Sequence, residues 1–142
     1  LDGYNCAHCI VLAFADIVEK NAKIDTNTAL RIASPYGGGM GRLREVCGAV
    51  SGMVLVANMM FGYDSPTDNE SKMDWYKDIQ SIVLEFKSRN GSYVCHELLN
   101  LPENDAKSPV PEKRTAEYYK KRPCGELVYL AAEIVGKRLM EL

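Results

Sequence analysis

The longest apolar run in the chain, VCGAVSGMVLVANMMFG at residues 46–62, constrains the fold more than any other segment. It is shorter than the roughly 20 residues that a membrane-spanning helix needs, so we expect no membrane insertion. We interpret it as part of a core helix over residues 42–61. Because neighbouring segments must bury such a helix, we expect the rest of the chain to pack around it.

Apolar residues spaced three and four positions apart predict further helices elsewhere in the chain. We expect them over residues 4–21, 27–34 and 71–89, with a short helix starting at Ser92 and a final one starting at Pro123. No segment shows the alternation that is typical of strands. The predicted class is therefore all-α: a single compact domain over residues 1–142, with about five to seven helices around one long central helix.

The charge balance excludes some classes of partner. The 142 residues carry a formal net charge of -2, which gives no global field that would favour nucleic acid or an acidic membrane. We interpret the basic run at 120–122 as a solvated face and the proline-rich stretch at 101–112 as a surface loop. The chain begins at Leu1 rather than Met, so we expect an upstream segment to have been removed or left out, with a lost signal peptide as one alternative.

Five cysteines distinguish the sequence: Cys6, Cys9, Cys47, Cys95 and Cys124. Their number is odd, so they cannot all pair with one another. We expect a reducing, cytoplasmic environment. There, unpaired thiols are more often metal ligands or redox groups than parts of structural disulfides.

Three of these cysteines, Cys6, Cys95 and Cys124, fall in the first turn of a predicted helix. The helix dipole and the unpaired N–H groups there favour negative charge, so we expect lowered thiol pKa values at these positions. Cys47 lies about two turns into its predicted helix, where this effect is weaker. A thiolate is the nucleophile in thiol exchange and also the form that binds metal. The alternative is that each cysteine is a small buried hydrophobic residue.

The segment CAHC places Cys6 and Cys9 three positions apart, a spacing that opens a helix in thioredoxin-like folds. Those folds contain a sheet, for which this sequence shows no pattern, and we interpret Cys9 as a core residue. His8 and His96 are the only histidines, and each adjoins a cysteine. Either could serve as a fourth metal ligand, although a partly exposed histidine near a helix start is the simpler interpretation.

A glycine-rich loop precedes Cys47. Its backbone N–H groups suit an anion or a cofactor, and the contacts that we predict are Gly38, Gly39, Gly41 and Gly48. The loop lacks the G-K-[ST] ending of a nucleotide-binding loop and follows no strand, so a flexible turn is the alternative.

Two glycines, Gly48 and Gly52, lie one helical turn apart and form a smooth strip beside Cys47. Another helix can approach closely over such a strip. We expect this approach to bring a second cysteine at a helix start, that of Cys6 or Cys124, into the neighbourhood of Cys47.

Four segments, GYNCA, YGGGMGR leading into CGAVSG, GSYVCHELL and RPCGELV, occur in an order that resembles a known family. Over nearly its whole length the chain is similar to the C_GCAxxG_C_C family of small proteins. The most specific element, C-G-A-x-x-G, is matched by Cys47, Gly48, Ala49 and Gly52. The four family cysteines fall on Cys6, Cys47, Cys95 and Cys124, and Cys9 lies outside the pattern. The resemblance implies redox activity or metal binding by these four residues.

Three functions are open at this point. In the first, the four family cysteines supply reversible disulfides for thiol redox or electron-transfer chemistry, with a redox protein as partner. In the second, the same four thiolates bind a metal ion or an iron–sulfur cluster. In the third, the chain is a structural or partner-binding helical domain with incidental thiols. We rank them in that order, and none of them decides the oligomeric state.

Overall fold

The computed structural model describes residues 3–101, 109–110 and 123–141. Within these ranges the chain forms helices and no β-strand, which confirms the predicted all-α class. The α-helices are, in chain order, α1 (Cys6–Ala13), α2 (Ala15–Ala22), α3 (Thr26–Ala33), α4 (Gly48–Phe61), α5 (Asn69–Asn90), α6 (Cys95–Leu98) and α8 (Cys124–Met140). A 3-10 turn at Ser34–Tyr36 follows α3. The basic run at 120–122 and most of the loop predicted at 101–112 lie outside the described residues.

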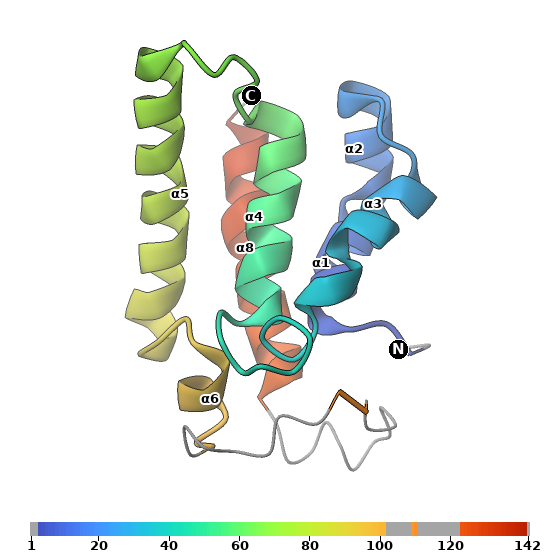
Figure 1. The fold of residues 1–142 in the computed structure, drawn as a ribbon, viewed down its shortest axis with the longest axis vertical. Helices are drawn as coiled ribbons and strands as arrows, with labels where there is room; N and C mark the ends of the chain where they lie inside the picture. Colours follow the sequence, from blue (N-terminus) through green and yellow to red (C-terminus); the bar gives the residue numbers. More distant parts are fainter. Residues whose placement is uncertain (1–2, 102–108, 111–122, 142) are drawn as a thin grey trace.

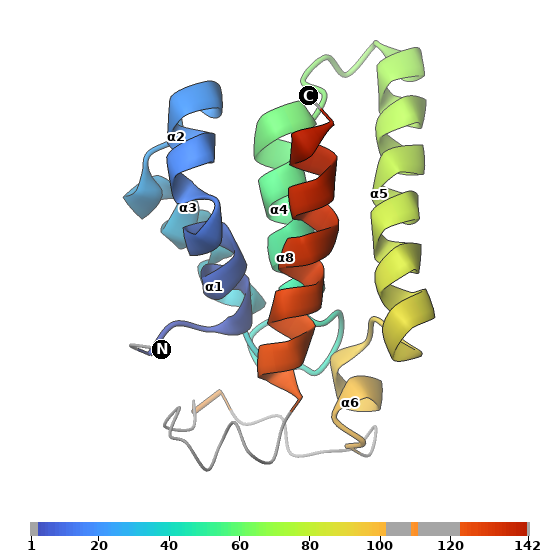
Figure 2. The same ribbon diagram turned by 180° about the vertical axis from the view of Figure 1, so that it is seen from behind.

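Helix α4 lies at the centre of the arrangement (Figure 1) and packs against α1, α2, α5 and α8. Figures 1 and 2 show α5 on one side of the α4–α8 pair and α1, α2 and α3 on the other. Side chains of α4 such as Met53 and Val56 are completely buried, as an apolar run of this kind requires. The central helix has 14 residues, fewer than predicted, whereas the peripheral α5 has 22.

Helix α4 begins at Gly48 and not at Arg42, so the predicted start is wrong. The residues from Gly38 to Arg42 all have φ values between 57° and 73°. These values are left-handed, and a right-handed helix cannot pass through them. Met40 and Arg42 are not glycines, and such residues seldom adopt this conformation, which is why the sequence pattern did not reveal the loop. As a result Cys47 is the N-cap of α4 and does not lie inside a helix.

The helix predicted at 4–21 is two helices, because the backbone at Phe14 (φ -115°, ψ 12°) interrupts it between α1 and α2. Asn5 caps α1, since its side-chain oxygen accepts the N–H of His8 at 2.9 Å. Asp25 caps α3 in the same way. None of the helices in the described ranges is both long and apolar enough to cross a lipid bilayer.

Candidate functional site

The four cysteines of the predicted site stand at four helix starts, and we call them the thiol cluster. Cys6, Cys95 and Cys124 are the first residues of α1, α6 and α8, and Cys47 is the N-cap of α4. Figures 1 and 2 show these helix starts toward one end of the molecule. The exposed fraction is 6% for Cys47 and 7% for Cys95 and Cys124, whereas Cys6 is half-buried. The cluster is therefore largely shielded from solvent, and Cys6 is its one partly accessible member.

A short backbone pairing holds Cys47 near Cys95. Val46 and Val94 form an isolated antiparallel bridge. Beside it, the N–H groups of Cys47 and Cys95 donate to carbonyl oxygens of the opposite segment at 2.8 and 2.5 Å. Because side chains alternate along paired segments, both cysteines face away from the valines. One bridge is too short to leave an alternating pattern in the sequence, so sequence reasoning missed it.

Glycines let α1 approach the start of α4. A Cβ atom on Gly52 would lie 3.0 Å from the Cα atom of Ala7, and one on Gly48 would lie 3.2 Å from the Cβ atom of Cys6. Both distances are shorter than the usual contact between carbon atoms of about 3.5–4.0 Å. The close approach predicted from these two glycines is present, and it places Cys6 beside the start of α4.

The glycine-rich loop also reaches the cluster. A Cβ atom on Gly39 would lie 2.7 Å from the Cβ atom of Cys95, and the φ value of Gly39 is +73°. Any other residue there would be strained and would clash with Cys95. Gly39 and Gly48 thus lie against cysteine side chains, while the cofactor contacts predicted for the loop glycines stay a prediction.

The thiols of the cluster interact with one another. A hydrogen bond to the Cys6 thiol, together with burial, raises the pKa of Cys124. Burial raises the pKa of Cys47 to about 12, although the N–H groups of Ala49 and Val50 at the helix start lower it. The predicted lowering of the pKa is therefore wrong for Cys124. The helix-start effect exists, but desolvation and neighbouring sulfur atoms outweigh it.

The comparison with protein families identifies the family over nearly the whole chain. A family model described as "Putative redox-active protein (C_GCAxxG_C_C)" matches residues 4–138. The chain belongs to this family. No curated protein and no solved structure matches the chain. In this member of the C_GCAxxG_C_C family, the matched range includes all four helix starts of the thiol cluster.

The C_GCAxxG_C_C cysteines have the right donor atoms for zinc or an iron–sulfur cluster. Their arrangement does not match, because in the part of the chain that the structure describes no three or more His, Cys, Asp or Glu side chains are grouped to hold a metal ion. His8 is also committed elsewhere: its Nδ1 accepts the N–H of Asn5 at 3.4 Å and its Nε2 pairs with the carbonyl oxygen of Leu30 at 3.0 Å. As it stands, the cluster is a set of thiols and not a preformed metal site.

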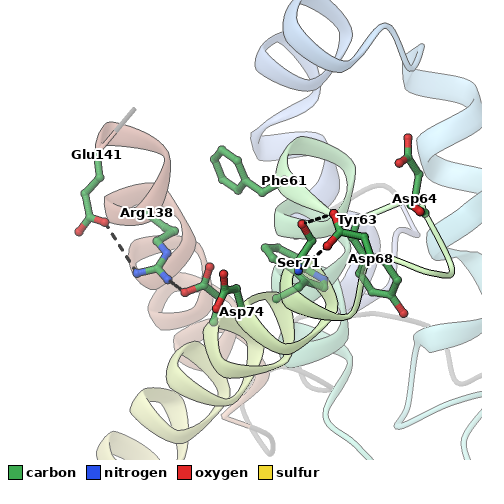
Figure 3. A pocket seen from close by; sticks show the side chains of 12 residues that line it. Phe61, Tyr63, Asp64, Asp68, Ser71, Asp74, Arg138 and Glu141 are labelled. Carbon is green, nitrogen blue, oxygen red and sulfur yellow. Dashed lines mark hydrogen bonds and ion pairs between the residues drawn. The ribbon is translucent and has the colours of Figure 1, made fainter.

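A second concave region lies at the opposite end, where α4 and α8 end and α5 begins (Figure 3). This cleft of about 510 Å³ is lined by Phe61, Gly62, Tyr63, Asp64, Ser65, Asp68, Ser71, Asp74, Trp75, Asp78, Arg138 and Glu141. Arg138 forms ion pairs with Asp78 and Glu141, and Trp75 donates to the side chain of Asn58 at 3.0 Å. The lining has no cysteine, so we do not connect the cleft with the family chemistry.

Proposed function

We propose that this protein is a thiol redox protein in which Cys6 and Cys124 interconvert between two thiols and a disulfide, with Cys47 and Cys95 as the neighbouring pair. The hydrogen bond between the Cys6 and Cys124 thiols carries this proposal. Two sulfur atoms in such contact need only a small movement to form a bond. The family description of redox activity supports the same conclusion.

The direction of the hydrogen bond defines the roles of the two sulfur atoms. The hydrogen bond with Cys6 and burial raise the pKa of Cys124, so we assign the proton to the Cys124 thiol, which then donates to the sulfur of Cys6. Negative charge is therefore best placed on Cys6, the nucleophile of the pair. Cys6 also begins α1, where unpaired N–H groups favour an anion.

The reaction balances with an external disulfide as oxidant. Two cysteine thiols and one R–S–S–R molecule yield the Cys6–Cys124 disulfide and two R–SH molecules, and two electrons pass to the external sulfur atoms. We propose another thiol–disulfide protein as partner and a reducing compartment such as the cytoplasm, in which the cluster begins as thiols.

Mass spectrometry of the intact and digested protein tests this function. We expect oxidation to join Cys6 to Cys124, and mild reductant to restore both thiols over repeated cycles. Cys124→Ser should remove this disulfide, while Ala13→Ser, a change at an exposed position of α1, should leave it intact. Thiols that do not cycle would contradict the proposal.

The metal-binding alternative has its own measurement. The observation in its favour is that the thiols of the cluster raise one another's pKa through repulsion between their negative charges. A cation bound among them would relieve this repulsion. Colour and metal content of protein purified without oxygen decide between the two functions. Metal bound in stoichiometric amount and lost in Cys47→Ser would replace the redox proposal, and metal-free protein with cycling thiols would support it.

A further inference from the structure

Cys9 is the one cysteine that the family pattern does not include, and its position in the structure differs from the prediction. It is half-buried, as Cys6 is, and is not a core residue. The other three cysteines, Cys47, Cys95 and Cys124, are all buried. The two thiols that solvent and an external molecule can reach are therefore both on α1.

Helix geometry brings these two thiols within bonding range of each other. Cys6 is the first residue of α1 and Cys9 is the fourth. Residues three apart on an α-helix have Cα atoms about 5 Å apart, inside the range of roughly 4.4–6.8 Å that a disulfide requires. The first turn is held by its cap, since the side chain of Asn5 accepts the N–H of His8 and that of His8 accepts the N–H of Asn5. A Cys-X-X-Cys pair at a helix start is a typical site of thiol–disulfide exchange.

Cys6 also belongs to the buried cluster through its hydrogen bond with Cys124. Its sulfur is thus shared between an accessible pair, Cys6 and Cys9, and a buried pair, Cys6 and Cys124. When the Cys6 sulfur is part of a disulfide, either Cys9 or Cys124 can attack it. Cys6 can therefore pass oxidation from an external disulfide to the buried thiols.

We propose that Cys9 is the resolving thiol of this protein: Cys6 and Cys9 form the disulfide that exchanges with external disulfides, and the oxidation then passes to Cys124. This inference rests on the proposed redox function and adds the route by which the cluster reacts with its substrate. The substrate class is an external disulfide, either a small molecule or a protein.

Each step of this route balances. The Cys6 thiolate attacks R–S–S–R, which gives a Cys6–S–S–R mixed disulfide and releases R–S⁻. The Cys9 thiolate attacks the Cys6 sulfur, releases the second R–S⁻ and forms the Cys6–Cys9 disulfide, and the two leaving thiolates take up the protons that Cys6 and Cys9 lost. Cys124 then attacks the Cys6 sulfur, forms the Cys6–Cys124 disulfide and transfers its proton to the departing Cys9 thiolate.

The experiment follows the order in which disulfides form. Fully reduced protein is mixed anaerobically with oxidised glutathione in one arm and oxidised thioredoxin in the other, quenched with acid at intervals, alkylated and mapped by mass spectrometry. The proteins compared are the wild type, Cys9→Ser, Cys9→Ala as a second variant, and Ala13→Ser as the control on the same helix. The arm that reacts faster identifies the source of the external disulfide.

In the wild type and in Ala13→Ser, we expect the Cys6–Cys9 disulfide before the Cys6–Cys124 disulfide. In both Cys9 variants, the mixed disulfide on Cys6 should persist about tenfold longer, because it must then be resolved by a thiol of the buried cluster such as the protonated Cys124. Wild-type cycling with no change in either Cys9 variant would overturn the role of Cys9 and leave the redox function in place. A wild type that forms no reversible disulfide in either arm would overturn both.

Discussion

The two ends of this helical domain are both built from helix termini, but they differ in burial and in charge. At the thiol end, helix starts meet, and Cys6 and Cys95 lie against the backbone of Gly48 and Gly39. At the cleft end, α4 and α8 end beside the start of α5, and the surface carries five carboxylates and a single arginine. The thiol end buries three of its four cysteines and keeps the Cys47 and Cys124 thiols protonated, whereas the cleft end is open and charged. We therefore expect changes at the thiol end to act through packing and desolvation, with large effects, and changes at the cleft end to act through screened charges, with small ones.

The largest expected effect is that of Gly52→Leu at the contact between α4 and α1. A side chain there collides with the backbone of Ala7, which cannot move as a flexible side chain would. We expect the free energy of unfolding to fall by about 3 kcal/mol or more, as measured by urea denaturation under reducing conditions. Formation of the Cys6–Cys124 disulfide should slow as well.

Gly136→Ala is the matched control for this prediction. A Cβ atom at Gly136 of α8 would lie 3.6 Å from the ring of Phe14, an ordinary contact. Helix propensity should then stabilise the protein by up to about 1 kcal/mol. If Gly52→Leu lowered stability but left thiol oxidation unchanged, the glycine strip would serve packing alone.

The next largest effect is expected in the pH dependence of the free energy of unfolding. The pKa of Cys47 rises from 9.0 to about 12 in the folded protein, so above about pH 9 the unfolded chain loses this proton while the folded chain keeps it. The unfolded state then binds fewer protons, and the free energy of unfolding falls as pH rises, by about 1.4 kcal/mol per pH unit from this group.

Urea denaturation at pH 8, 9, 10 and 11 with a phosphine reductant measures this dependence. Cys47→Ala should show a correspondingly shallower decline above about pH 9, whatever its stability at pH 8. Parallel profiles for the two proteins would mean that the Cys47 thiol is as well solvated in the folded state as in the unfolded one.

A smaller effect is expected when a helix cap is removed at either end of the molecule. Asn5 caps α1 at the thiol end and Asp68 caps α5 at the cleft, where its carboxylate accepts the N–H of Ser71 at 3.0 Å. Asn5→Ala and Asp68→Ala should each lower the free energy of unfolding by about 1 kcal/mol. Only Asn5→Ala should raise the alkylation rate of Cys6, by at least about twofold, because the first turn of α1 then opens more often. Equal alkylation rates in the two variants would show that the cap does not control access to the thiol.

The smallest effect is expected for Asp78→Asn in the cleft. Its ion pair with Arg138 is partly exposed, with 47% and 32% of the two side chains accessible. Such pairs contribute about 0–1 kcal/mol, and salt screens them. Wild type and variant should converge in 0.5 M NaCl, with identical rates of thiol oxidation. If the free energy of unfolding fell by well over about 1 kcal/mol, this ion pair would contribute far more to stability than an exposed pair is expected to.

Much of the fold could be predicted because it depends on local patterns. The stripes of α5 and α8 and the caps Asn5 and Asp25 are set by residues within one or two helical turns, so the sequence reveals them directly. The start of α4 could not be found in this way. It depends on left-handed backbone at Met40 and Arg42, a conformation that non-glycine residues seldom adopt, and on a bridge between Val46 and Val94, which lie far apart in the sequence.

For the site, the sequence alone determined the family: the order and spacing of Cys6, Cys47, Cys95 and Cys124 identify it, and the two glycines beside Cys47 predict the close approach of α1. Only the tertiary structure decided their chemical state. Whether a helix start lowers a thiol pKa depends on how much water and how many other sulfur atoms surround it, and packing decides both. The same packing leaves Cys9 accessible and buries Cys124, a difference between two cysteines that no local pattern contains.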